Sequence, residues 1–368
     1  MRIVVFGLTI SSSWGNGHAT LWRGLCKHLV RCGHSITFFE RDVPWYADAR
    51  DFHEIPGGRL VLYSHWEDVG SVAQASVADA DTAIVTSYCP DALAASELVL
   101  NQSRAMPVFY DLDTPVTLAR LRAGESVPYI GPDGLDGFAL VLSFTGGRRL
   151  FEEYRRRLGA STIRPLYGHV DPDIHRPVAA EPHYRADLSY LGTYSEDRQA
   201  ALEALFVAPA RSRQDLRFLI GGAQYPPEFP WAPNIYFVRH LPPSEHAAFF
   251  ASSRRLTLNV TRRAMAEMGW CPSGRLFEAA ACGVPLLSDC WQGLEDFFTP
   301  GEEILLAQDA SDTLHALERD VRELSEISRR ARERTLDQHS SHKRAAELIA
   351  LLEQSADAAA RQPEIQGA

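Results

Sequence analysis

The chain has 368 residues, which exceeds one ordinary hydrophobic core and suits two α/β domains. Hydrophobic residues make up 45% and charged residues 23% of the sequence, the profile of a globular protein. The formal net charge of −10 disfavours a protein that coats nucleic-acid phosphates, so we expect no nucleic-acid partner.

The first half of the chain alternates short apolar strands with helical stretches. Residues 2–8 are too few for a membrane-spanning helix, and no cleavage site follows them, so we predict a buried first strand and a cytoplasmic protein. Apolar residues recur at helical spacing over 20–32, and Gly33 ends this helix. Further strands are predicted at 35–40, 59–62, 82–86, 107–111 and 139–143. This alternation is typical of a parallel sheet covered on both faces.

The second half repeats the plan after a turn-rich segment around Pro165–Pro177. Strands are predicted at 188–191, 217–221, 235–238, 256–260 and 285–288, and helices at 197–206, 274–282, 311–337 and 342–353. We therefore predict two doubly wound domains, 1–168 and 169–340, facing each other across a cleft. A helix at 341–354 and a flexible tail at 355–368 follow. In such sheets ligands bind beyond the carboxyl ends of the strands.

The cysteines carry no pattern of a disulfide or metal framework. They form no C-x-x-C pair, and their flanks are apolar: Cys26, Cys32, Cys89, Cys271, Cys282 and Cys290. We predict reduced, buried thiols and no zinc site.

A glycine-rich loop precedes the first helix. Gly15, Asn16 and Gly17 would let the backbone approach a ligand closely, and a helix N-terminus offers free N–H groups. His18 would lie in the first turn, where an imidazole suits general-base chemistry. A dinucleotide fingerprint is the alternative, with Glu40 as the ribose-binding acid. The distance of this loop from the end of the first strand argues against it.

Asp111 and Asp113 form a D-x-D pattern at the end of a predicted strand. Such a pair holds a metal-bound diphosphate in some transferases, but the pattern is common by chance. We interpret Asp113 as the cap of a helix with Pro115 near its start, and we predict no metal site. Asp113 stays a candidate catalytic residue on the acceptor side.

The strongest motif runs from Ser273 to Asp289 and is typical of a loop, a helix and a strand. Ser273 and Gly274 can present backbone N–H groups to phosphate oxygens, and Arg275 can clamp a diphosphate. Glu278 can accept two hydrogen bonds from a ribose diol. The alternative is a plain buried helix in which Arg275 and Glu278 form an i, i+3 pair. Because a carboxylate in an apolar stretch is costly, we favour a nucleotide site.

Two parts of this motif resemble known glycosyltransferases. Residues 278–285 resemble the E-A-x-A-x-G-x-P signature of group-1, family-4-like GT-B enzymes, and residues 273–278 resemble the S-x-R-x-F-E run of the CgeB-type spore-maturation branch. The resemblance implies the GT-B architecture of two Rossmann-like domains, with helix 341–354 packing back on the first. In one departure, Trp270 stands where the group-1 pattern has a second glutamate. Its possible replacements are Glu267, Asp289 and Glu295.

The resemblance also implies a function: transfer of a sugar from a nucleotide diphosphate sugar to an acceptor hydroxyl, without a metal or other cofactor and with retention of configuration. The implied donor-binding residues are Gly192, Thr193, Tyr194, Ser273, Gly274, Arg275 and Glu278. His18 would be the base if the enzyme inverts, and would contact the sugar or acceptor if it retains. His169 and His175 are interpreted as hinge or surface residues.

Three other functions stay open at this point. A sugar-nucleotide epimerase or phosphorylase would share the phosphate and ribose contacts. A non-catalytic nucleotide-sugar-binding protein would explain the loss of the glutamate at Trp270. An NAD enzyme would use the N-terminal loop instead. Because one fold supports many chemistries, the choice depends on the geometry of the site.

Overall fold

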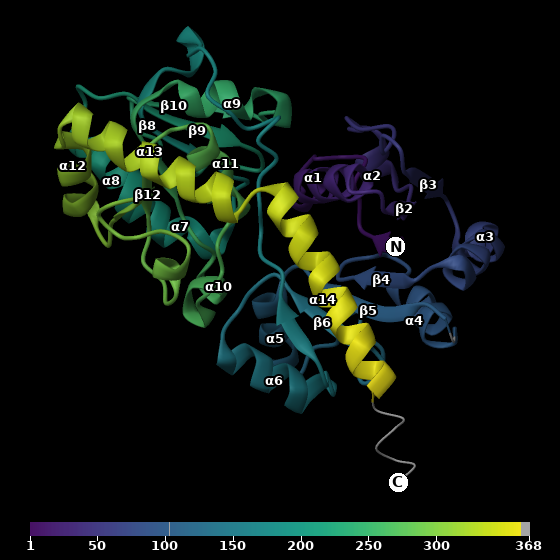
Figure 1. Cartoon of the computed structure of the whole chain (residues 1–368). Coiled ribbons are helices and arrows are strands. Elements are labelled where there is room, and N and C mark those ends of the chain that lie inside the picture. Colours follow the sequence, from purple (N-terminus) through teal and green to yellow (C-terminus); the bar gives the residue numbers. More distant parts are fainter. Residues whose placement is uncertain (103, 362–368) are drawn as a thin grey trace. The chain divides into compact units, whose positions relative to one another are not determined.

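The chain divides into two compact units. The computed structural model describes residues 1–102 and 104–361. The first unit contains Met1–Tyr167 together with the C-terminal segment that begins at Ser341, and the second contains Gly168–Ser340 (Figure 1). In the described part of the chain, no helix is both long and apolar enough to cross a membrane.

The described residues of the first unit form a seven-stranded parallel sheet. Its strands are β1 (Arg2–Gly7), β2 (Ser35–Arg41), β3 (Arg59–Tyr63), β4 (Thr82–Thr86), β5 (Met106–Asp111), β6 (Leu140–Ser143) and β7 (Ile163–Pro165). Their spatial order is β3-β2-β1-β4-β5-β6-β7. The strand order therefore reverses between β1 and β4, and the loops that follow these two strands leave the sheet side by side.

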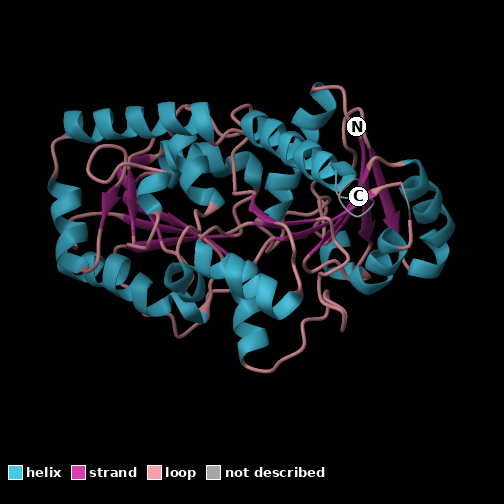
Figure 2. Ribbon diagram, turned by 60° about the horizontal axis from the view of Figure 1, so that its bottom comes forward, coloured by secondary structure: helices cyan, strands magenta, loops and turns pink. Residues whose placement is uncertain are grey.

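Helices cover both faces of this sheet (Figure 2). They are α1 (His18–Arg31), α2 (Pro44–Ala47), α3 (Trp66–Asp79), α4 (Ala92–Leu100), α5 (Thr114–Arg122), α6 (Arg148–Leu158) and α14 (Ser341–Arg361). The apolar face of α14 packs on α1, with Ala345, Leu348 and Leu352 buried in the same cluster as Leu25 and Leu29. The C-terminal helix is thus part of the core of the first unit.

The C-terminal helix is longer than the sequence predicted. The helix was predicted to end at 354, whereas α14 continues to Arg361 and includes residues 355–361 of the segment predicted as a tail. This segment is rich in alanine, the residue with the highest helix propensity, which favours continuation of the helix. The remaining residues of the predicted tail, 362–368, lie outside the described residues.

The second unit repeats the plan around a six-stranded parallel sheet within its described residues. Its strands are β8 (Ala186–Leu191), β9 (Phe218–Gly222), β10 (Ile235–Arg239), β11 (Ser253–Asn259), β12 (Leu286–Ser288) and β13 (Leu305–Leu306), in the order β10-β9-β8-β11-β12-β13. The order reverses between β8 and β11. The five strands predicted from the sequence agree with β8 to β12 within a few residues, whereas β13 was not predicted.

Helices and short helical turns connect these strands. They are α7 (Glu196–Leu202), α8 (Ala208–Ser212), α9 (Pro243–Ala251), α10 (Arg263–Met268), α11 (Gly274–Ala281), α12 (Ala310–Glu318) and α13 (Val321–Gln338), with turns at Pro182–Tyr184, Glu203–Val207 and Leu294–Asp296. The single helix predicted at 311–337 is wrong, since the chain breaks between α12 and α13. Asp320 accepts the N–H of Arg322 and caps α13. The sequence contains this cap, but leucines at helical spacing on both sides of it predicted one continuous helix.

Two cysteines also depart from the prediction. Cys32 and Cys290 are exposed, whereas the other four are buried. Cys32 caps the C-terminal end of α1, and Cys290 follows β12 in a loop, so neither faces the core.

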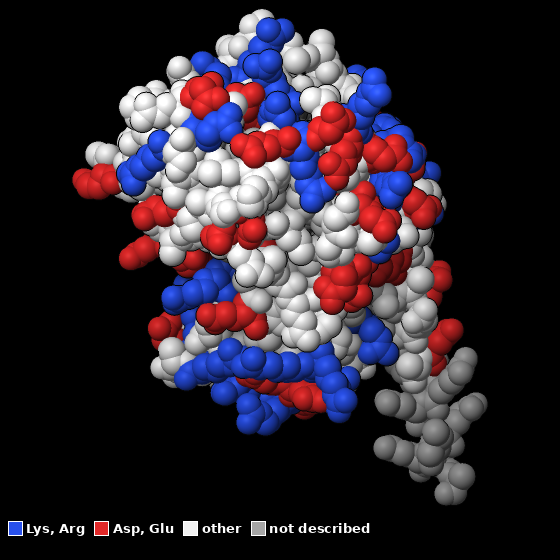
Figure 3. Space-filling view, turned by 90° about the vertical axis from the view of Figure 1, so that its left-hand side faces the viewer, with Lys and Arg blue, Asp and Glu red and all other residues white. Residues whose placement is uncertain are grey.

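On the face shown in Figure 3, acidic and basic side chains are interspersed. In α13, for example, Arg329 pairs with Glu326 and Glu333.

Candidate functional site

Glu40 organises the glycine-rich loop of the first unit. It is buried at the end of β2, where its carboxylate accepts hydrogen bonds from the hydroxyls of Thr9 (2.7 Å) and Ser11 (2.5 Å). It also accepts the backbone N–H groups of Ile10 (2.8 Å) and Ser11 (3.0 Å). Both carboxylate oxygens are therefore engaged within the fold, which removes the ribose-binding acid that the dinucleotide interpretation requires.

The loop then turns into α1 through Gly15, Asn16 and Gly17. Gly15 has φ +61°, a conformation that favours glycine. The side chain of Asn16 is buried; its oxygen accepts the N–H of His18 at 3.0 Å, and its amide donates to the carbonyl of Thr9 at 3.3 Å. His18 begins the helix, half-buried, with its ring 6.0 Å from that of Phe144. The structure thus brings these loop residues together at the carboxyl end of β1.

The two aspartates of the D-x-D pattern have separate roles. Asp111 is fully buried and accepts hydrogen bonds from Tyr154, from Thr117 (2.7 Å) and from the N–H of Asp113 (2.8 Å). Burial raises the pKa of Asp111, although these hydrogen bonds oppose the shift. Its carboxylate oxygens therefore accept hydrogen bonds from within the fold.

Asp113 occupies the N-cap position of α5, but its side chain does not cap the helix. Its carboxylate instead accepts the hydroxyl of Tyr88 at 3.0 Å, so the predicted capping role is wrong for the side chain. Tyr88 follows β4 and has φ +63°, which is strained for a residue other than glycine. Backbone strain of this kind clusters at functional sites. Tyr88 is therefore a further candidate functional residue, and no sequence pattern indicated it.

In the second unit, the residues predicted to bind the donor lie at the carboxyl ends of β8 and β11, the two neighbouring strands between which the strand order reverses. Gly192, Thr193 and Tyr194 follow β8 and rest on the end of β9: Gly192 N–H donates to Gly221 O and Tyr194 N–H to Ala223 O, each at 2.9 Å. The segment that contains Ser273 follows the neighbouring strand β11. Both groups therefore lie at the carboxyl edge of one sheet.

Ser273 is the N-cap of α11 and engages two of the N–H groups at the start of the helix. Its hydroxyl accepts the N–H of Arg275 at 3.3 Å, and its carbonyl accepts that of Leu276 at 3.1 Å. Among the described residues, the N–H of Gly274 has no acceptor at this end of the helix. It is the backbone donor that a phosphate oxygen could use here.

Glu278 lies buried one turn further along α11, inside a cluster of basic side chains. Arg275 Nη1 donates to its Oε2. His175 Nε2 lies 3.7 Å and His246 Nδ1 3.6 Å from the same oxygen. His169 and His175 were predicted to be hinge or surface residues, and the surface alternative is wrong because both are buried. His246, on α9, belongs to the cluster although the sequence analysis did not single it out.

The charges in this cluster are strongly coupled. Burial alone would raise the pKa of Glu278, but the charge of Arg275 and the two histidines holds that pKa well below its usual value. Burial, reinforced by the Arg275 charge, lowers the pKa of His246 to about 4. Burial also lowers the pKa of His175. At neutral pH the cluster therefore contains an ionised carboxylate, a guanidinium and two neutral imidazoles.

We expect this cluster to make stability fall in mild acid. Unfolded His246 takes up a proton near pH 6.5, whereas the folded side chain does so near 4, so stability is lost as pH falls through this window. The loss is about 1.4 kcal/mol per pH unit, or about 3 kcal/mol in total. Thermal unfolding at pH 7.5 and 4.5 should show a smaller drop in His246→Asn than in the wild type. An equal drop would contradict the assignment.

The arrangement of His175, His246 and Glu278 also meets the spacing of a metal site, since their ligand atoms lie within 4.8 Å of one another. However, Arg275 Nη1 already lies 3.0 Å from His246 Nδ1 and bonds Glu278 Oε2. The guanidinium thus uses two of the lone pairs that a metal ion would need. It also supplies the positive charge opposite the carboxylate, whereas Nδ1 of His175 has no hydrogen-bond partner among the described residues.

Trp270 takes the place of the second glutamate and has a structural role. Its Nε1 donates to Asp296 at 2.7 Å, and its backbone φ is +44°. Of the possible replacements, Asp289 accepts both the N–H and the hydroxyl of Thr261. Glu267 and Glu295 are exposed. No contact between any of these three carboxylates and Glu278 occurs among the described residues.

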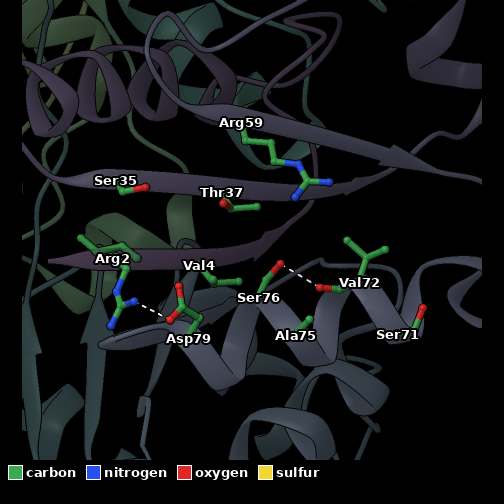
Figure 4. A pocket seen from close by; sticks show the side chains of 11 residues that line it. Arg2, Val4, Ser35, Thr37, Arg59, Ser71, Val72, Ala75, Ser76 and Asp79 are labelled. Carbon is green, nitrogen blue, oxygen red and sulfur yellow. Dashed lines mark hydrogen bonds and ion pairs between the residues drawn. The ribbon is translucent and has the colours of Figure 1, made fainter.

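A cavity of about 470 Å³ lies elsewhere in the first unit (Figure 4). Arg2, Ser35 and Arg59, the first residues of β1, β2 and β3, line it together with α3. Its position is at the amino ends of the strands, opposite the edge that carries His18 and Asp113. It is therefore separate from the candidate site.

Comparisons with known proteins match part of the second unit with α14 in one case and the whole chain in others. Residues 198–350 match the family model described as "Glycosyl transferase-like". Sucrose-phosphate synthase from Thermosynechococcus elongatus superimposes with a TM-score of 0.69 at 15% identity, over 97% of this chain and 99% of that one. HepE from Anabaena, solved with UDP and glucose, superimposes with a TM-score of 0.65 at 12% sequence identity. The superposition covers 96% of this chain and 100% of HepE.

An alpha-glucosyltransferase, solved with UDP-glucose and DNA containing an abasic site, gives a TM-score of 0.68 at 14% identity, over 96% and 99% of the two chains. The chain has the GT-B fold. A comparison with curated proteins gives no match. The predicted GT-B architecture is confirmed, and the family match supports a glycosyltransferase. In GT-B terms, Glu278 and the 192–194 loop lie in the second Rossmann-like unit, and His18 and Asp113 in the first.

Proposed function

We propose that the protein is a glycosyltransferase that moves a sugar from a nucleoside diphosphate sugar to an acceptor hydroxyl. The observation that supports this proposal most strongly is the environment of the Glu278 carboxylate. Its carboxylate is buried and ionised, and its hydrogen bond and its close approaches to basic side chains of the described residues all reach Oε2. Oε1 is left to accept hydrogen bonds from a ligand, as a ribose diol would offer.

The family match and the names of similar structures support a nucleotide sugar as donor. HepE was solved with UDP and glucose, and the alpha-glucosyltransferase with UDP-glucose. We propose the same class of donor here. The closer placement in the CgeB-type branch rests on the S-x-R-x-F-E resemblance at 273–278.

Around the diphosphate we assign the N–H of Gly274, the 192–194 loop and the positive charge of Arg275. The leaving group gains negative charge as the bond to the sugar breaks, and fixed donors stabilise that charge. We propose that these groups do so without a metal ion. On the acceptor side we assign His18 and Asp113, with retention of configuration and with His18 contacting the sugar or acceptor.

The test is a calorimetric titration with a panel of nucleoside diphosphates in the presence of a chelator. One nucleotide should bind in the micromolar range. Glu278→Ala should weaken it about 10- to 100-fold, the effect of losing hydrogen bonds to a charged acceptor. Glu267→Ala, which removes an exposed glutamate on α10, should bind as the wild type does.

Turnover then separates the transferase from its rivals. Release of the nucleotide from its sugar donor should depend on an added acceptor. An epimerase would convert the donor without acceptor, and a non-catalytic binding protein would show no turnover with any acceptor. If the folded wild type binds no nucleoside diphosphate, the proposed function is wrong.

A further inference from the structure

The hydrogen bonds of His246 fix its tautomer. The side chain is buried on α9, and its Nε2 lies 3.3 Å from the carbonyl oxygen of Leu241. A carbonyl only accepts, so Nε2 carries the proton. Nδ1 therefore presents a lone pair toward α11, which packs against α9.

That lone pair faces two groups, Nε2 of His175 at 3.5 Å and, closer, the guanidinium of Arg275. Nη1 of Arg275 lies 3.0 Å from His246 Nδ1, and a guanidinium only donates. The same Nη1 donates to Oε2 of Glu278. One nitrogen of Arg275 is thus shared between an imidazole and a carboxylate.

This sharing changes how Arg275 faces Glu278. A guanidinium opposite a carboxylate commonly forms a fork of two parallel hydrogen bonds that uses both oxygens. Here the bond to His246 holds Nη1 in place, and the contacts of Arg275, His175 and His246 all converge on Oε2. Among the described residues none donates to Oε1.

We infer that His246 is a positioning residue that, through Arg275, keeps one oxygen of Glu278 for the hydroxyls of the bound nucleotide. This inference rests on the proposed function and adds a source of specificity to it. The site should distinguish a ribonucleotide from its 2′,3′-dideoxy analogue, because only the former can donate to Oε1. In the absence of His246, Arg275 forms the fork of two hydrogen bonds with Glu278 and occupies Oε1. The preference for the ribonucleotide over its 2′,3′-dideoxy analogue is then lost.

The experiment compares affinities for the nucleoside diphosphate that binds best and for its 2′,3′-dideoxy analogue. The wild type should prefer the ribonucleotide about 10- to 100-fold. His246→Leu, which removes the acceptor, should reduce this preference to less than about threefold. His246→Asn, which keeps an acceptor near the position of Nδ1, should retain most of it. His183→Leu, at an exposed histidine of the same unit, should retain it fully.

The outcomes separate this inference from the proposed function. If the wild type binds neither nucleotide, both are wrong. If the wild type discriminates and His246→Leu discriminates equally, His246 only fills space and the inference alone is overturned. Should His246→Leu fail to fold, His246→Ala gives the same test, because alanine also removes the acceptor that holds Arg275 Nη1. Unchanged discrimination in His246→Ala would also overturn the inference.

Discussion

Replacing Glu40 with alanine is expected to lower the free energy of unfolding of the first unit by about 4 kcal/mol. The carboxylate accepts four hydrogen bonds from the loop after β1, two from hydroxyls and two from backbone N–H groups. All of these donors are buried. Alanine would leave them without an acceptor, and water cannot reach them without opening the loop.

Glu40→Gln is the matched control and should cost only about 1 kcal/mol. The glutamine oxygen can accept both N–H groups at the Oε2 position, while its amide donates to the hydroxyls of Thr9 and Ser11, which can rotate to accept. Denaturant unfolding and hydrogen exchange at the amides of Ile10 and Ser11 measure the two effects. Equal losses in the two variants would show that the charge, rather than the set of acceptors, holds the loop.

Gly222→Ala is expected to destabilise the second unit by about 4 kcal/mol or more, and to displace the 192–194 loop. A Cβ at this position would lie 2.0 Å from the carbonyl oxygen of Gly192 and 2.8 Å from its carbon. Both are backbone atoms, so no side-chain rotation relieves the clash. The loop would have to leave β9, which breaks the bond between Gly192 N–H and Gly221 O.

Gly221→Ala, at the adjacent position, is the control. Its Cβ would meet side-chain atoms of Phe249 and Leu191 at 3.0 Å and 3.1 Å, and these can shift. We expect a loss of about 1–2 kcal/mol and little change in nucleotide affinity. Circular dichroism melts and nucleotide titrations of both variants check this. Wild-type affinity in a folded Gly222→Ala protein would show that the 192–194 loop does not contribute to binding.

The sequence predicted the two sheets well because their strands are buried apolar runs between helical segments. The boundary near Gly168 was also readable, since a run of turn-forming residues carries no helical or strand period. The break between α12 and α13 was missed because leucines continue at helical spacing across it, and only Asp320 marks the new cap.

The candidate site was only half predictable. Glu278 and Arg275 could be found because a carboxylate and a guanidinium stand together in an apolar helix. His175 and His246 lie 103 and 32 residues before Glu278, and nothing in their local sequence connects them to it. Tyr88 could not be found either, since its left-handed backbone is set by the packing of loops after β4 and β5.

The packing of α14 on α1 affects the order in which the protein can fold during synthesis. The first unit is interrupted by all of Gly168–Ser340, and its last core residues belong to α14. At typical translation rates the ribosome needs roughly ten to thirty seconds to make the intervening segment. During that time the apolar surface of α1 around Leu25 and Leu29 lacks its cover, while the second unit is contiguous and can close first. The nascent first unit therefore exposes part of its core for longer than the second unit does.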